Sequence, residues 1–454
     1  MSAAATSAGP TRPFDVDAFL DAQAIGRGHV GLIVLLVLAM LLDGYDIFVV
    51  GMVLPFLARD MGAAPAALTS VFVVQQFGLL VGTFLVGPLS DRFGRRTTLL
   101  ACIGAFTVLT LATTQVATPA QLIGIRFASA LFFAGVIPNC IALSSEIAPS
   151  RWRAAIVGIV FCGFTGGHFI GAFVQAFTLE AYGWQSAFWL GGGLGLAVFA
   201  LLFLFLPESI RFRVRRNPRD PRIPRALRQI APNVTLGGGE EFTAGSVPKS
   251  TSRKAPARAL FDARRRWATL WLWAAFFCAF MVSQFVGSWG ATVLHTLGGL
   301  SMQRIAAAAS IGTIAGIAGT ASAGFLIDRF GSGRALPAFF LGGAVFTAAI
   351  GLVDMASPAF FVVYALYGYF TNAGLAGVNA LGSLIYPSEM RATGVSWAAG
   401  AGRAGGMVGP AIGGVLIAGG ANVATIYLCA GIPLVIGVAA SLLIARTNHG
   451  ARAA

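Results

Sequence analysis

Long apolar stretches separated by short polar segments recur along the whole chain of 454 residues. Each stretch is long enough to cross about 30 Å of hydrocarbon as an α-helix, which rises about 1.5 Å per residue. The pattern predicts twelve membrane-spanning helices, at residues 30–57, 67–89, 97–116, 121–145, 154–179, 187–206, 267–295, 304–327, 335–354, 358–386, 393–419 and 423–445.

The composition supports an all-α membrane protein. Hydrophobic residues make up 57% of the chain and charged residues 11%, whereas about 25% of an average soluble domain is charged. The 58 glycines suit membrane helices that pack closely through small residues. The sequence has no paired cysteine spacing, nucleotide-binding loop or hydrolase motif. We therefore predict no enzyme activity, no metal and no cofactor.

The positive charges predict the topology. Residues 207–266 hold fifteen Lys or Arg against five Asp or Glu, in a chain of net charge +14. Basic loops remain in the cytoplasm, and no nucleic-acid-binding motif accompanies the charge. We expect a cytoplasmic tail at 1–29, six-helix halves at 30–206 and 267–445, a basic, mostly flexible cytoplasmic linker at 207–266 that can contact membrane lipids, and a cytoplasmic tail at 446–454. Within the linker, a short surface helix is expected around Ile223–Ile230.

An internal repeat relates the two halves. The segment Gly87-Pro-Leu-Ser-Asp-Arg-Phe-Gly-Arg-Arg96 follows the second span, and Gly324-Phe-Leu-Ile-Asp-Arg-Phe-Gly-Ser-Gly-Arg334 follows the eighth. Ser145-Glu146 and Ser388-Glu389 form a second pair of matching sites. Two related six-helix halves predict a binding site at their interface, near the middle of the membrane.

These motifs resemble the major facilitator superfamily, and the resemblance covers essentially the whole chain. Leu42-Asp-Gly-Tyr-Asp46, Leu206-Pro-Glu-Ser-Ile-Arg-Phe212 and Tyr386-Pro-Ser-Glu-Met-Arg-Ala-Thr-Gly394 are similar to motifs of its aromatic acid:proton symporters. The resemblance implies a monomeric protein of the bacterial inner membrane. It would import an aromatic carboxylate of the hydroxybenzoate, benzoate or phenylpropanoate type together with protons.

Four charged residues lie well inside predicted spans, away from the span ends, namely Asp43, Asp46, Arg126 and Arg403. A charge within the membrane costs at least about 2.5–3.5 kcal/mol, so each is a candidate functional residue. Helical rise puts Asp46 and Arg126 at the same depth, about 22 Å from the cytoplasmic edge, and Arg403 at about 15 Å.

Chemistry assigns roles to these four residues. The planar guanidinium of Arg403 can bind a substrate carboxylate through two hydrogen bonds. Asp43 and Asp46 lie on one helix face, where two ionised carboxylates would repel each other, so this pair is the expected proton carrier. Arg126 would stabilise the ionised state and contribute to the substrate site. The alternative is a permanent ion pair that only orders the helices.

Other side chains are candidates for contact with an aromatic ring or its hydroxyl groups. Aromatic rings stack on one another, and amide groups donate to and accept from a hydroxyl. The preferred candidates are Tyr45, Trp289, Gln284, Asn372 and Asn379.

The repeated motifs also predict a cytoplasmic gate. By resemblance, Asp91 and Asp328 pair across the halves with arginines when the transporter faces outward, and Glu146 with Arg153 and Glu389 with Arg391 add to the gate. The alternative is that the arginines only fix the topology. The complete set is Asp91, Arg92, Arg95, Arg96, Glu146, Arg153, Asp328, Arg329, Glu389 and Arg391.

Two other functions are compatible with the sequence. An exporter that exchanges drugs or metabolites for protons would have the same fold. A receptor or signalling protein that does not transport would act through residues 207–266.

Overall fold

The computed structural model describes residues 13–231, 234, 240–243, 261–262, 266–386 and 388–453. Within these residues, twelve helical segments are long and apolar enough to cross a membrane, as predicted. The N-terminal group comprises α2 (Arg27–Asp60), α3 (Thr69–Phe93), α4 (Arg95–Thr113), α5 (Pro119–Phe133), α6 (Val136–Ile147), α7 (Arg153–Tyr182) and α8 (Gln185–Phe205). The C-terminal group comprises α11 (Arg266–Thr292), α12 (Met302–Phe330), α13 (Ser332–Ile350), α14 (Ala359–Ile385), α15 (Ser388–Ala418) and α16 (Val423–Ala453).

Several span boundaries differ from the prediction. The fourth span is two helices, α5 and α6, interrupted at Ala134 and Gly135. The eleventh span begins at Ser388, whereas residue 393 was expected. Apolar runs set the spans, but helices continue into polar residues wherever the backbone can keep bonding to itself.

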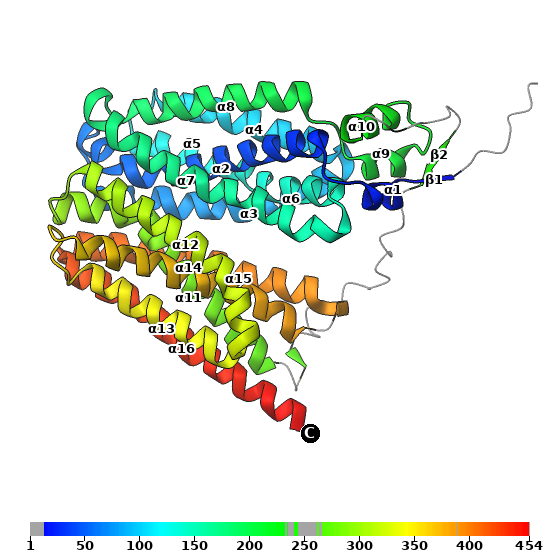
Figure 1. Cartoon of the computed structure of the whole chain (residues 1–454). Coiled ribbons are helices and arrows are strands. Elements are labelled where there is room, and N and C mark those ends of the chain that lie inside the picture. The colour runs from blue at the N-terminus through cyan, green and yellow to red at the C-terminus, as the bar shows by residue number, and fades with distance from the viewer. Residues whose placement is uncertain are drawn as a thin grey trace, which may run out of the picture.

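The two groups of helices lie one above the other in Figure 1 and converge at one end of the molecule. At this end a single apolar core includes residues of both groups, such as Val53 and Leu54 of α2 with Trp289 of α11. Toward the other end, the N-terminal and C-terminal groups have separate apolar cores. Large exposed apolar side chains such as Phe84 and Val415 suit a lipid-facing surface.

The internal repeat is visible in the backbone. α3 ends at Gly94 with φ of 100°, and α12 ends at Gly331 with φ of 81°; in each case the next helix starts immediately afterwards. Positive φ is favourable only for glycine, so each motif places a glycine where the chain reverses direction.

The N-terminal segment and the linker form a small layer on the N-terminal half. This layer contains β1 (Pro13–Asp15), α1 (Val16–Ala22), α9 (Ile210–Arg216), α10 (Ile223–Ile230) and β2 (Glu241–Thr243). β1 pairs with β2 in parallel. α10 is the expected helix, whereas α9 and α1 were not expected. We call the end of the bundle that carries this layer the linker end, and the opposite end the far end (Figure 1).

Glycines let α2 and α7 approach to backbone contact. A Cβ atom on Gly44 would lie 1.9 Å from the carbonyl oxygen of Phe164, and one on Gly167 would lie 1.9 Å from that of Leu41. Both distances are far below contact distance, so any side chain at these positions forces the helices apart. The close packing fixes the position of the segment that carries Asp43 and Asp46.

Replacing Gly167 by alanine is expected to destabilise the protein by about 1–3 kcal/mol, the range measured for overpacked cores. Gly166→Ala is the matched control, because a Cβ on Gly166 meets no atom within 4 Å. Thermal unfolding of the purified variants in detergent measures the difference. Equal melting temperatures for the two variants would contradict the close packing of α2 on α7.

Candidate functional site

Asp46 and Arg126 form an ion pair inside the N-terminal half. Arg126 Nη1 donates to Asp46 Oδ1 over 2.9 Å, and Nη2 donates to the backbone oxygen of Asp46 over 2.7 Å. The side chains are 1% and 0% exposed. The structure thus joins two residues that helical rise had placed at one depth.

Neutral side chains form hydrogen bonds with the remaining polar atoms of this ion pair. Thr110 Oγ1 donates to the second carboxylate oxygen of Asp46. Arg126 Nε donates to Gln75 Oε1 over 3.4 Å, and Gln75 Nε2 donates to the backbone oxygen of Ile47 over 3.1 Å. A buried ion pair is favourable only when its remaining polar atoms are bonded in this way. All of these partners belong to the N-terminal half.

Asp43 is a buried carboxyl group without a partner. The residue is fully buried, and among the described residues neither carboxyl oxygen has a hydrogen-bond partner. Asp43 lies one helical turn from Asp46, on the linker side. Burying an ionised carboxylate without a counter-charge is costly, whereas a protonated carboxyl group is neutral.

Arg403 lies at the interface between the halves. From α15 its Nη1 reaches α3, where it donates to the backbone oxygen of Leu79 over 3.3 Å and to Thr83 Oγ1. No carboxylate in the described part of the chain forms an ion pair with this half-buried arginine. Its positive charge is therefore not neutralised by any described side chain.

Amide side chains from both halves meet near Arg403. A Cβ atom on Gly406 would lie 3.3 Å from Gln284 Cγ and 3.7 Å from Gln76 Cδ. Glycine at this position leaves room between α3, α11 and α15. Gln284, predicted to contact substrate, thus lies at the interface of the halves, and its role in binding stays a prediction.

An aromatic surface borders the amides. The ring of Phe48 lies 4.4 Å from that of His168 and 6.0 Å from that of Phe164, measured between centroids. Phe48 also lies directly opposite Gly287 of α11. A cation, two amides and an aromatic surface are therefore adjacent at the interface, and together they match the chemistry of an aromatic carboxylate.

The other predicted ring and hydroxyl contacts donate hydrogen bonds to backbone oxygens. Tyr45 donates to the backbone oxygen of Ala187 over 2.7 Å within the N-terminal half. Trp289 is fully buried and donates to the backbone oxygen of Pro410 over 2.9 Å. Asn372 and Asn379 each donate to a backbone oxygen four residues earlier in α14. Their roles in binding stay predictions.

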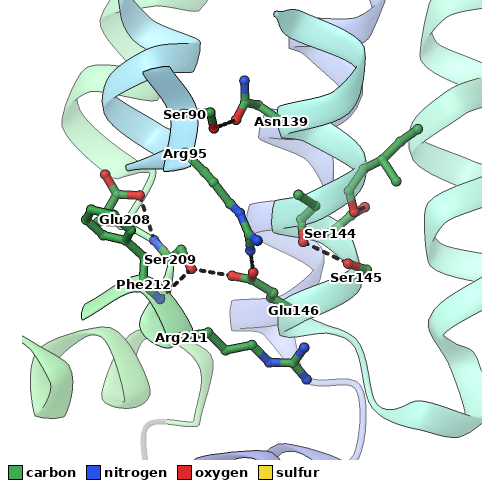
Figure 2. A network of polar contacts seen from close by, with 12 residues as sticks. Ser90, Arg95, Asn139, Ser144, Ser145, Glu146, Glu208, Ser209, Arg211 and Phe212 are labelled. Carbon is green, nitrogen blue, oxygen red and sulfur yellow. Dashed lines mark hydrogen bonds and ion pairs between the residues drawn. The ribbon is translucent and has the colours of Figure 1, made fainter. Parts of the chain in front are cut away.

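A polar network occupies the linker end of the N-terminal half (Figure 2). Arg95 forms an ion pair with Glu146, which also accepts from Ser209 Oγ. Glu208 accepts from the backbone N–H of Arg96 over 2.9 Å and from that of Thr97 over 3.3 Å. Its carboxylate thus binds the free N–H groups at the start of α4, where the helix dipole favours negative charge.

Three of the predicted gate residues, Arg95, Arg96 and Glu146, belong to this network. The expected pairing of Glu146 with Arg153 is not formed in this structure, where Glu146 pairs with Arg95 and Arg153 Nη2 lies 3.8 Å from Asp21 Oδ1 of α1. Sequence reasoning did not find Asp21, since it treated residues 1–29 only as a cytoplasmic tail.

The remaining gate residues make no cross-half ion pair among the described residues. Asp91, Arg92, Asp328 and Arg329 are all exposed at the linker end. Arg92 lies over the ring of Phe93, and Arg329 lies over that of Phe330 in the same way, so the repeat extends to these contacts. The side chains of Glu389 and Arg391 lie outside the described residues.

Sequence reasoning missed several of the residues that complete these groups. Phe48, Thr110 and Thr83 were not predicted, although Phe48 lies only two residues beyond Asp46. Glu208 and Ser209 were noted only for their family resemblance. The sequence did offer a clue to Glu208, because a carboxylate next to a proline at the end of a span can reach the start of a neighbouring helix.

A family model decides the identity. The model for the Major Facilitator Superfamily matches residues 36–366 and 323–454 of this chain. The chain belongs to the major facilitator superfamily. The superfamily's model, the twelve spans and the internal repeat agree, so the prediction of a transporter with this fold is confirmed.

Within the superfamily, the chain is similar to bacterial transporters of aromatic acids. The chain is 33% identical to a gallate transporter of Pseudomonas putida and 30% identical to the 4-hydroxybenzoate transporter PcaK of Pseudomonas aeruginosa, with 96% of each chain covered in both cases. The predicted resemblance to aromatic acid permeases is thereby confirmed. Together with the twelve spans, these relatives make this chain a multi-pass inner membrane protein.

Solved structures support the fold. A bacterial homologue of the human lysosomal transporter Spinster, solved in an inward-facing and unoccupied conformation, aligns with a TM-score of 0.68 at 19% identity, covering 93% of this chain and 98% of that one. The nucleoside transporter NupG aligns with a TM-score of 0.69 at 16% identity, covering 92% and 99%.

Proposed function

We propose that this protein imports a small aromatic carboxylate together with protons by alternating access. The observation that carries the proposal is Arg403, a half-buried guanidinium between the halves that no described carboxylate neutralises. Relatives named as gallate and 4-hydroxybenzoate transporters support an aromatic substrate. The substrate carboxylate would replace the bonds that Arg403 makes to Leu79 and Thr83.

The aromatic ring would lie against the surface formed by Phe48 and His168. Rings prefer offset or edge-to-face contacts at such surfaces. Gln76 and Gln284, one from each half, would bond ring hydroxyls. A site that contacts both halves can respond to their relative movement, which alternating access requires.

The proton would be carried by Asp43. Its carboxyl group is buried and unpartnered, so a bound proton avoids an isolated charge in the membrane. Asp46 has a different part in this proposal, since Arg126 already neutralises it. The pair would hold α2 and α5 in register beside the site where the proton binds and leaves.

We further propose that the linker end faces the cytoplasm. The arginines of α9 and α10 and those of the repeated motif lie at this end, as the positive-inside rule requires. The halves contact each other at the far end, through Gly51 against Gly287 and Phe56 against His295. This arrangement is that of a transporter open to the cytoplasm, ready to release substrate.

Uptake of labelled benzoate, 4-hydroxybenzoate, gallate and phenylpropanoate by cells expressing the protein tests the function. Accumulation of at least one acid that collapses with a proton uncoupler is the expected result. Export of an accumulated acid, or no movement of any of them, would contradict the proposal.

Replacing Arg403 by alanine is expected to reduce uptake at low substrate concentration by about 10- to 100-fold, because a charge-assisted hydrogen bond contributes about 1.5–3 kcal/mol. Arg403→Lys should retain part of the activity, since lysine keeps the charge but loses the planar fork. Arg59→Ala, at an exposed position of the far end, is the control. Uptake by Arg403→Ala equal to that of the control would refute the role of Arg403.

A further inference from the structure

α10 is an amphipathic helix with a row of exposed arginines. Ile223, Leu227 and Ile230 are buried against the N-terminal half. On the opposite side, Arg222 at the N-cap and Arg225 and Arg228 within the helix are exposed. Residues three apart lie on one side of a helix, so these arginines form one outward-facing row.

None of the three guanidinium groups forms an ion pair with a carboxylate among the described residues. Two acidic residues that flank α10 in the sequence pair with other arginines: Asp220 with Arg213, and Glu241 with Arg219. Positive charge on Arg222 and Arg225, at the start of the helix, opposes the helix dipole, whereas Arg228 in the last turn is favourable, so these effects oppose each other and the row is not explained by stabilisation of α10 alone.

The contacts of α10 place it at the edge of the membrane-spanning region. Gln229 donates to the backbone oxygen of Phe205, the last residue of α8, over 2.6 Å. Leu204 and Phe205 are 68% and 55% exposed, as expected of lipid-facing side chains that end at this level. Figure 1 shows α10 beside the end of α8 at the linker end.

The start of α2 lies on the other side of α10. A Cβ on Gly28 would lie 2.1 Å from the backbone oxygen of Gln229, so the two backbones are in direct contact. Val30, two residues further along α2, is 52% exposed. α10 is therefore bordered by lipid-facing residues of two spans, at the depth where lipid headgroups lie.

We propose that Arg222, Arg225 and Arg228 bind the phosphate groups of anionic phospholipids at the surface of the membrane. Guanidinium groups form paired hydrogen bonds with phosphate oxygens. The acyl chains of the same lipids would cover the exposed residues of α2 and α8. Because α10 contacts α2 and the end of α8, both in the N-terminal half, bound lipid holds that half at a fixed height in the membrane.

Lipid titration of the full-length protein in neutral detergent tests the proposal, with lipid adducts counted by native mass spectrometry. The wild type should bind phosphatidylglycerol more tightly than phosphatidylcholine. A basic residue near the surface contributes about 1 kcal/mol, so the triple variant Arg222→Gln, Arg225→Gln, Arg228→Gln should bind phosphatidylglycerol about 100-fold more weakly. The single variant Arg225→Gln should bind about fivefold more weakly.

A control with the same change in charge separates a defined site from diffuse attraction. The triple variant Arg215→Gln, Arg216→Gln, Arg219→Gln alters exposed arginines at the end of α9 and in the segment that follows it, and should retain most of the affinity. Equal losses in the two triple variants would overturn the assignment to α10. Binding of glycerol phosphate as tight as that of the lipid would overturn the assignment to phospholipid, and so would equal binding of the two lipids.

Discussion

Replacing Asp46 by asparagine is expected to abolish uptake and to destabilise the protein by about 3–5 kcal/mol, the range for removing one partner of a buried ion pair. The substitution leaves the Arg126 guanidinium charged, fully buried and without its counter-charge. It also weakens the hydrogen bond from Thr110. Thermal unfolding in detergent and uptake in cells measure the two effects.

The double variant Asp46→Asn, Arg126→Gln serves as the control for this prediction. It removes both charges, so it should be more stable than Asp46→Asn alone. A single variant that unfolds within 1 kcal/mol of the wild type would show that the pair lies in contact with water, contrary to its burial.

Replacing Asp43 by asparagine is expected to separate substrate movement from the proton gradient. An amide has nearly the shape of a protonated carboxyl group but cannot release a proton, so the carrier should still exchange labelled for unlabelled substrate. Accumulation against a gradient should be lost; with one proton per substrate, a pH difference of one unit provides about 1.4 kcal/mol, or tenfold accumulation.

Proteoliposomes with an imposed pH gradient allow both measurements on one preparation. Asp43→Glu keeps a titratable group and should retain part of the accumulation. Full accumulation by Asp43→Asn would assign proton coupling to another group. Loss of exchange as well as accumulation would mean that Asp43 is needed for binding or folding and not for coupling alone.

The depth of a residue in the membrane could be predicted from the sequence. The direction in which its side chain points around the helix axis could not. Helical rise put Asp46 and Arg126 at one level, and they form an ion pair. Tyr45 is adjacent to Asp46 in sequence, but successive residues differ by about 100° around a helix. Its ring instead packs between Gly171 and Gly191, away from the interface of the halves.

The expectation that charged residues within the membrane share one site was also too simple. Asp43, Asp46 and Arg403 were expected around one site, but the structure divides them between the interior of the N-terminal half and the interface. Only packing between sequence-distant helices decides which side of α2 meets α4 and which side meets α11. In the linker, the many arginines masked the helical spacing of Ile210, Val214, Ile223 and Leu227, which are all buried.

α2 is a single helix of 34 residues, which corresponds to a rod about 50 Å long. Near its start Gly28 contacts α10, in its middle lie Asp43 and Asp46, and beyond them Gly51 meets Gly287 of the other half. If α2 pivots at its contact with α11, its linker end moves furthest, and Asp43 and Asp46, which lie closer to the pivot, move less. The thickness of the surrounding bilayer, acting on the height of α10, would then change how readily the carrier completes its cycle.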